Sequence, residues 1–201
     1  MSKHIHSYLA LGDSYTIGES VPIHESFPYQ AVQMMRKKGF AMHAAEIVAR
    51  TGWTTFELAE HCLHTQLLDH YDFVSLLIGV NNQYRGLPFE EFKHDFTFLM
   101  QKAIHFAKDA KRVVAFTIPD WGVTPFAHDR NRADIAKEID AMNAFIQTHC
   151  TEKLVHCIEI TSLTRTASSN PDLLAKDQLH YSGKAHQAWA EQMVDYWLRV
   201  V

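Results

Sequence analysis

The sequence predicts an α/β fold in which helices cover both faces of a five-stranded parallel sheet. Segments typical of strands and of helices alternate along the chain, and each strand candidate is a short apolar run that ends at turn residues. Strands that alternate with helices are joined by right-handed crossovers, which make the strands parallel. The 201 residues suit one domain over 1–201, and a hydrophobic fraction of 47% is enough for a sizeable core.

The first half of the chain contains two strand–helix pairs. They are a strand over 5–11, a helix over 27–38, a weaker strand over 42–49 and a helix from 55 to about 68. Gly39 ends the first of these helices. The second begins with a capping box, in which the side chains of Thr54 and Glu57 satisfy each other's backbone N–H groups.

Three further strand–helix pairs make up the second half. The strands are expected over 72–79, 112–118 and 154–160, and the helices begin at Pro88, run through 135–146 and begin at about 183. The run over 72–79 is the clearest buried strand. Proline is common at the first position of a helix, and the apolar residues that follow Pro88 recur three or four apart. They form one face that we expect in the core: Phe89, Phe92, Phe96, Leu99, Ala103 and Phe106.

Composition excludes several classes of protein. The net charge is −4 and no basic cluster occurs, so a nucleic-acid partner is not expected. No apolar run reaches the roughly 18 residues that a membrane-spanning helix needs, and the N-terminus lacks a cleavage-type leader. The cysteines Cys62, Cys150 and Cys157 have no CxxC spacing and are expected as free thiols. Together these features predict a cytoplasmic protein.

Polar residues follow each predicted strand. In chain order they are Gly12-Asp13-Ser14, Thr51-Gly52-Trp53, Gly79-Val80-Asn81-Asn82, Pro119-Asp120-Trp121-Gly122 and, after a polar loop, Asp177-Gln178-Leu179-His180. In an open parallel sheet, ligands bind outside the carboxyl ends of the strands. We therefore expect a serine, a glycine amide, an asparagine amide, an aspartate and a histidine to meet at one rim.

These residue types suit acyl transfer. A serine hydroxyl such as that of Ser14 is a weak nucleophile until a base takes its proton, and the neutral imidazole of His180 suits that task near pH 7. Asp177 lies three residues before His180, close enough to fix the imidazole tautomer. The backbone N–H groups of Ser14 and Gly52 and the side-chain amide of Asn81 are candidates for an oxyanion hole.

The segments GDS at 12–14, Gly52, GVNN at 79–82 and DQLH at 177–180 resemble the four blocks of the SGNH (GDSL-type) hydrolases. The resemblance runs from residue 8 to about 190, in the family's order. It implies a flavodoxin-like three-layer fold, Ser14 as nucleophile, Asp177 and His180 as acid and base, and Ser14, Gly52 and Asn81 as the oxyanion hole. Two residues depart from the family pattern: Tyr15 replaces leucine, and Asn82 replaces aspartate.

Four loop residues are candidates for substrate binding, since they follow the third and fourth strands at the same rim: Tyr84, Arg85, Trp121 and Phe126. Loop aromatics also pack as lids, so both interpretations stay open. His4 and His6 near the first strand, and His61 and His64 around Cys62, invite a metal interpretation. No third ligand has an obvious spacing and no HExxH motif occurs, so neither a metal nor a cofactor is expected.

The leading hypothesis is a serine esterase that hydrolyses small, soluble acyl esters through an acyl-enzyme on Ser14. The sequence shows no large insertion that would form a deep lipid lid. Two alternatives remain: a binding module that kept the fold without activity, and an acyltransferase that passes the acyl group to an acceptor other than water. The expected partner is a small-molecule ester, and the sequence does not determine the oligomeric state.

Overall fold

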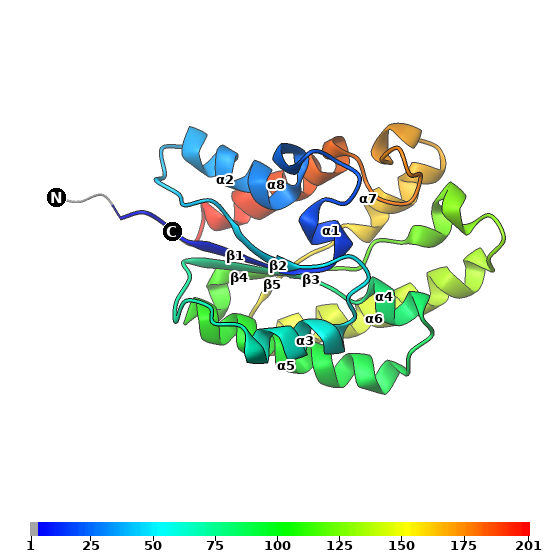
Figure 1. Cartoon of the computed structure of the whole chain (residues 1–201), viewed down its shortest axis with the longest axis horizontal. Helices are drawn as coiled ribbons and strands as arrows, with labels where there is room; N and C mark the ends of the chain where they lie inside the picture. Colours follow the sequence, from blue (N-terminus) through cyan, green and yellow to red (C-terminus); the bar gives the residue numbers. More distant parts are fainter. Residues whose placement is uncertain (1–3) are drawn as a thin grey trace.

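The computed structural model describes residues 4–201 and has a five-stranded sheet at its centre (Figure 1). The strands are β1 (Tyr8–Gly12), β2 (Glu46–Ala49), β3 (Phe73–Leu77), β4 (Val113–Phe116) and β5 (His156–Ile158). Their order in the sheet is β2-β1-β3-β4-β5, and every neighbouring pair is parallel. The predicted α/β fold with five parallel strands is confirmed.

Helices cover both faces of this sheet (Figure 1). One layer contains α1 (Ser14–Ile17), α2 (Phe27–Lys37), α7 (Thr161–Arg165) and α8 (Gly183–Trp197). The other contains α3 (Thr55–His64), α4 (Val80–Tyr84), α5 (Phe89–Ala107) and α6 (Arg132–Lys153). Short 3₁₀ turns lie at Ile23–Glu25, Ala110–Arg112, Trp121–Val123, Pro125–Ala127, Thr166–Ser168 and Pro171–Leu173. The arrangement is the three-layer sandwich that the sequence predicted.

The core lies between the sheet and these two layers. Every residue of β1, β3 and β4 is buried, as expected for parallel strands that are covered on both faces. On the α8 side, Trp197 stacks on Phe73 with ring centroids 4.4 Å apart and meets the edge of Tyr8 at 4.8 Å. The apolar face expected after Pro88 is buried at most of its positions, although Phe89 at the first turn of α5 is exposed.

The register brings three strand ends level with one another. Gly12 at the end of β1 pairs with Ala49 of β2 and with Leu77 of β3. Figure 1 shows α1, α4 and α7 gathered at this end of the sheet, with the first described residues and the C-terminus at the opposite end. The loops that carry the predicted rim therefore leave the sheet side by side.

Most differences from the sequence-based prediction concern element ends. The helix that begins with the Thr54 capping box is confirmed, but it ends at His64 because Thr65 is extended. The first strand begins at Tyr8 rather than at residue 5, since His6 forms only an isolated bridge to Met42. The short helices α1, α4 and α7 were not predicted, because four or five residues carry no readable period.

Two predictions from composition concern membrane-spanning helices and the state of the cysteines. Of the helices within residues 4–201, none has the length and apolar character that crossing a bilayer requires. The cysteines Cys62, Cys150 and Cys157 are free thiols, as predicted.

Candidate active site

Ser14 lies at the sharp turn from β1 into α1. Asp13 caps α1, because its Oδ1 accepts the N–H of Tyr15 at 3.0 Å, and Ser14 is the first helical residue. The turn requires glycine at position 12, since a β-carbon there would collide with the carbonyl oxygen of Leu77. Within residues 4–201 the Ser14 hydroxyl has no hydrogen bond to another side chain, so it is available to a ligand.

The His180 imidazole is oriented by Asp177. His180 Nδ1 lies 2.6 Å from Asp177 Oδ2, and the other carboxylate oxygen accepts the N–H groups of Leu179 at 3.1 Å and His180 at 3.0 Å. The ring of Tyr15 contacts the imidazole edge-on, with centroids 5.6 Å apart. Because Nδ1 faces the carboxylate, Nε2 is the nitrogen left for a reacting group.

Ser20 is a partner of Asp177 that the sequence did not indicate. Its hydroxyl donates to Asp177 Oδ2 at 2.6 Å across 157 positions of sequence, from a left-handed backbone with φ of 64°. Partial burial opposes ionisation of Asp177, but hydrogen bonds from Ser20, His180 and backbone N–H groups outweigh it and hold the pKa of this carboxyl well below its usual range. Asp177 is therefore a carboxylate throughout the neutral range.

Ser14 and His180 line one pocket of about 170 Å³, together with Gly52 and Asn81. Gly52 has a left-handed backbone with φ of 82°, and Arg85 holds its carbonyl oxygen through a hydrogen bond. Within the described chain the N–H of Gly52 donates to no other residue. The N–H of Ser14 begins a helix and so lacks an intrahelical acceptor. Two backbone donors thus border the space beside the Ser14 hydroxyl.

Asn81 and Asn82 have different surroundings. Asn81 is half-buried on α4, and its side-chain amide donates to the carbonyl oxygen of Trp53 at 2.9 Å, which leaves the second amide hydrogen free. Asn82 is buried, accepts the N–H of Thr55 at 3.0 Å and donates to the Thr55 hydroxyl at 2.8 Å. Asn82 therefore ties α4 to the first turn of α3, which keeps Asn81 next to the loop that carries Gly52.

An aromatic wall closes one side of the pocket. Trp121 lies 5.2 Å from Tyr84 and 6.1 Å from Phe126 between ring centroids, and all three residues line the pocket. Gln83 fixes the indole, because its Oε1 accepts the Trp121 N–H at 2.6 Å. Arg85, the fourth residue predicted for substrate binding, lies beside the pocket rather than in its lining, with Glu57 Oε2 at 3.3 Å.

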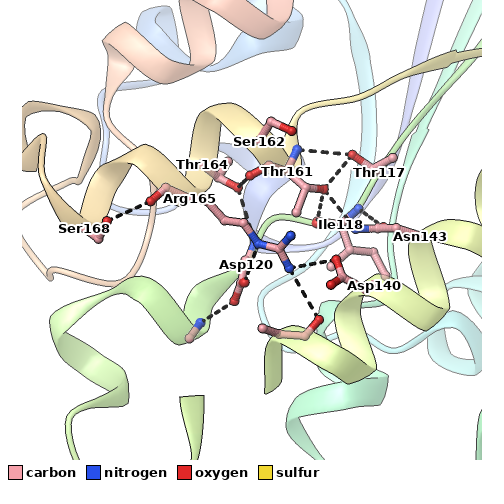
Figure 2. Close-up of polar contacts among 12 residues, drawn as sticks. Thr117, Ile118, Asp120, Asp140, Asn143, Thr161, Ser162, Thr164, Arg165 and Ser168 are labelled. Atoms are coloured by element: carbon pink, nitrogen blue, oxygen red, sulfur yellow. Dashed lines mark hydrogen bonds and ion pairs between the residues drawn. The ribbon is translucent and has the colours of Figure 1, made fainter. Parts of the chain in front are cut away.

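A polar network anchors the loop that carries Trp121 (Figure 2). Figure 2 shows the Arg165 guanidinium between two carboxylates, at 2.8 Å from Asp120 Oδ2 and 2.8 Å from Asp140 Oδ1. The side chain of Asp120 is only 1% exposed, and its other oxygen accepts the N–H of Gly122 at 2.9 Å. This network joins the loop after β4 to α7 and α6, so the Trp121 backbone has little freedom.

Asp13 itself carries an unusual carboxyl. Its side chain is buried directly beside Ser14, and within residues 4–201 its Oδ2 has no hydrogen-bond partner. Burial disfavours the charged form and raises the pKa of Asp13 to about 7, although backbone hydrogen bonds from Tyr15 and neighbouring residues oppose the shift.

A second cavity, of about 320 Å³, lies on the other side of α4. Its lining combines apolar side chains with Glu138 and two amides: Asn82, Gln83, Gly86, Leu87, Phe89, Phe92, Glu138, Ala141 and Met142. It is larger than the Ser14 pocket, but its lining has no serine hydroxyl, no cysteine thiol and no histidine. The residue types that line the smaller pocket therefore favour it as the candidate active site.

Comparisons with known proteins agree with the fold. The model of the GDSL-like lipase/acylhydrolase family matches residues 10–188. Similar solved structures include a lipase/acylhydrolase from Enterococcus faecalis (16% identity, TM-score 0.73, covering 95% of this chain and 94% of that one). Another is the acetylxylan esterase Axe2 from Geobacillus stearothermophilus (15% identity, TM-score 0.75, covering 95% and 93%). A third is the esterase EstA from a Pseudoalteromonas species (17% identity, TM-score 0.68, covering 96% and 99%). At these identities the structural likeness shows the fold alone, and no curated protein matches the sequence.

Proposed function

This chain belongs to the GDSL-like lipase/acylhydrolase family and is a hydrolase, and we propose that it acts as a serine esterase on small acyl esters. One observation carries the proposal: Ser14 and an Asp177-oriented His180 line the same pocket at the carboxyl ends of the strands. Nucleophile, base and orienting acid are the three groups that acyl transfer by a serine requires.

The proposed reaction proceeds through an acyl-enzyme. His180 Nε2 takes the proton of the Ser14 hydroxyl as Oγ attacks the ester carbonyl carbon, and the imidazolium then gives that proton to the departing alcohol. In the second half, His180 takes a proton from water as the water oxygen attacks the acyl carbon, and the imidazolium then returns that proton to Ser14 Oγ as the bond to the acyl carbon breaks and the acid leaves. Asp177 stabilises the imidazolium in both halves, and Ser20 positions Asp177 through its 2.6 Å hydrogen bond.

The developing oxyanion is proposed to be stabilised by three donors: the N–H groups of Ser14 and Gly52 and the free amide hydrogen of Asn81. The Gly52 N–H supports this role because it has no acceptor among residues 4–201, and the hydrogen bond from Arg85 to the Gly52 carbonyl holds the loop in place. Fixed donors cost no reorganisation at the moment of reaction.

The pocket supports a small acyl group. Its volume of about 170 Å³ is modest, and Tyr84, Trp121 and Phe126 form an apolar wall. The similar structure from Geobacillus stearothermophilus is described as an acetylxylan esterase, which is consistent with an acetyl-sized substrate. We propose acetyl to butyryl esters as the substrate class.

A fluorophosphonate probe and a series of nitrophenyl esters test the proposal. The probe should label wild-type protein at Ser14 and should not label Ser14→Ala, while Ser169→Ala, which removes an exposed serine hydroxyl, should be labelled as the wild type is. kcat/KM should decline as the acyl chain grows beyond four carbons.

Ester turnover retained by Ser14→Ala would exclude the mechanism, and absence of labelling in wild type would favour a binding module. Transesterified product in the presence of added alcohols would identify an acyltransferase.

A further inference from the structure

Two histidines and an aspartate meet at the end of the sheet opposite Ser14. His4 and His6 precede β1 and Asp72 immediately precedes β3, so all three lie at the amino ends of neighbouring parallel strands. His4 and His6 are two positions apart in an extended segment, which places their side chains on the same side of the chain. The sequence analysis identified only the two histidines of this cluster. The fold adds Asp72, which lies 66 positions after His6 in the sequence.

The three side chains have the spacing of metal ligands. His4 Nε2 lies 2.8 Å and His6 Nδ1 3.5 Å from Asp72 Oδ1, and the three atoms all lie within 4.8 Å of one another. In a tetrahedral zinc site with bonds of about 2.0–2.1 Å, neighbouring ligand atoms are about 3.3 Å apart. We propose that His4, His6 and Asp72 bind one divalent transition-metal ion, zinc by preference, with water as the fourth ligand.

His6 provides an unused lone pair. Its side chain is 18% exposed, and its Nδ1 is buried with no hydrogen-bond partner among residues 4–201. The ring lies against Phe40 and Phe73, with centroids 5.7 and 5.8 Å away, so packing holds its orientation. A buried nitrogen without a partner is costly, and a metal ion would satisfy it.

Asp72 is held in the orientation that a ligand needs. Its Oδ2 accepts the N–H of Ser7 at 2.9 Å and the Ser7 hydroxyl at 3.2 Å, which turns Oδ1 towards the two histidines. The Ser7 hydroxyl in turn accepts the N–H of Asp72 at 3.1 Å. Partners of this kind, which fix a ligating carboxylate through its other oxygen, are typical of metal sites.

Arg112 limits the affinity of the site. Its Nη1 lies 3.5 Å from Asp72 Oδ1 and 3.4 Å from the Asp72 carbonyl oxygen. Without a metal, Arg112 compensates the charge of Asp72, and His4 Nε2 contacts the same carboxylate oxygen. With a metal, the guanidinium stays close to the cation, and the two positive charges repel. Removing the charge of Arg112 should therefore strengthen binding.

Cobalt and zinc titrations of the chain, prepared without a polyhistidine tag, test the site. Co²⁺ should produce the intense visible bands of tetrahedral coordination at one ion per chain, and Zn²⁺ should displace them. His4→Ala and His6→Ala should each weaken zinc binding at least about 100-fold, because loss of a partner that merely orients a ligand already costs 10–100-fold. Arg112→Gln should strengthen it by about tenfold. His64→Ala on α3 is the matched control and should bind as the wild type does.

Thermal unfolding gives a second measurement. Zinc should raise the Tm of wild type and not that of His4→Ala, which removes a mostly exposed side chain and should fold as the wild type does. Ester turnover should be the same in both proteins, so failure of the metal site is distinguishable from failure of the esterase proposal. Absence of tetrahedral cobalt bands, or equal zinc affinity in wild type, His4→Ala and His6→Ala, would overturn the site.

Discussion

Asn81 is the proposed oxyanion donor whose role is most easily separated from folding. Its amide interacts with a neutral carbonyl in the ground state and with an oxyanion in the transition state, so the interaction strengthens as the reaction proceeds. Asn81→Ala should lower kcat by about 10²–10³ with little change in KM, as removal of one such donor typically does. Steady-state kinetics check this, and a loss confined to KM would assign Asn81 to substrate binding.

Asn82, one residue later, should behave in the opposite way. It satisfies the N–H and the hydroxyl of Thr55 in a buried position, so Asn82→Ala leaves a buried donor without an acceptor. We expect the free energy of unfolding to fall by about 1–3 kcal/mol, with a smaller loss of kcat than in Asn81→Ala. Urea unfolding of the two variants, measured beside their kinetics, tests the contrast. Equal effects at both positions would show that neither asparagine has a separate role.

Ser20 combines an unfavourable backbone with a hydrogen bond to Asp177. Ser20→Ala and Ser20→Gly both remove the hydroxyl, but glycine relieves the left-handed conformation and should be more stable than alanine by up to about 1 kcal/mol. If the hydroxyl positions Asp177, both variants should lose kcat by about tenfold and keep KM. A purely structural residue would instead give a glycine variant with wild-type kcat, and stopped-flow acylation rates would distinguish the two results.

At the scale of elements, the ion pair between Arg165 of α7 and Asp120 stabilises the loop after β4. Asp120 is buried and forms an ion pair with Arg165, so Arg165→Ala would remove that partner from a buried side chain (Figure 2). Because Arg165 is 36% exposed, the pair is only partly buried, and we expect a loss of about 2 kcal/mol in the free energy of unfolding. Asp140→Asn, whose carboxylate is mostly exposed, is the control and should cost less than about 1 kcal/mol. Similar losses in both variants would contradict the dominant role of Asp120.

The elements themselves were largely predictable, because each long helix and each strand has its own signal. The capping box at Thr54 and Glu57 fixed one helix start, and Pro88 and Gly183 marked two others. What could not be predicted were contacts between distant segments. Nothing in the sequence connects Ser20 with Asp177 or His6 with Asp72, because each pair meets only through the fold. His6 and Asp72 meet because β1 and β3 are neighbours in the sheet. The order of strands in the sheet cannot be inferred from local sequence patterns.

For the whole molecule, two buried groups should shape the dependence of stability on pH. The folded state keeps Asp13 protonated up to its pKa of about 7, whereas in the unfolded chain it ionises near 3.8, so its contribution is lost as pH rises between these values. His186 acts with the opposite sign. Burial lowers its pKa to about 3, so its contribution is present above about 6.5 and is lost as pH falls towards 3.

The two effects partly cancel in wild type, so a variant is needed to separate them. Relative to wild type, Asp13→Asn should become more stable as pH rises from 4 to 7, by up to about 4 kcal/mol. Denaturant unfolding of both proteins at several pH values across this interval measures the difference. A difference that stays constant with pH would show that Asp13 is ionised in the folded state.

The position of the proposed site residues along the chain has a consequence for synthesis. His180 and α8 emerge from the ribosome long after Ser14, and α8 then packs against α2 and accepts the N–H of Phe27 through His186. Until then the growing polypeptide carries a serine with no base to activate it. Under the proposed mechanism, a nascent chain that still lacks residues 177–180 should not turn over esters, and a premature stop codon before position 177 should yield a product without this activity.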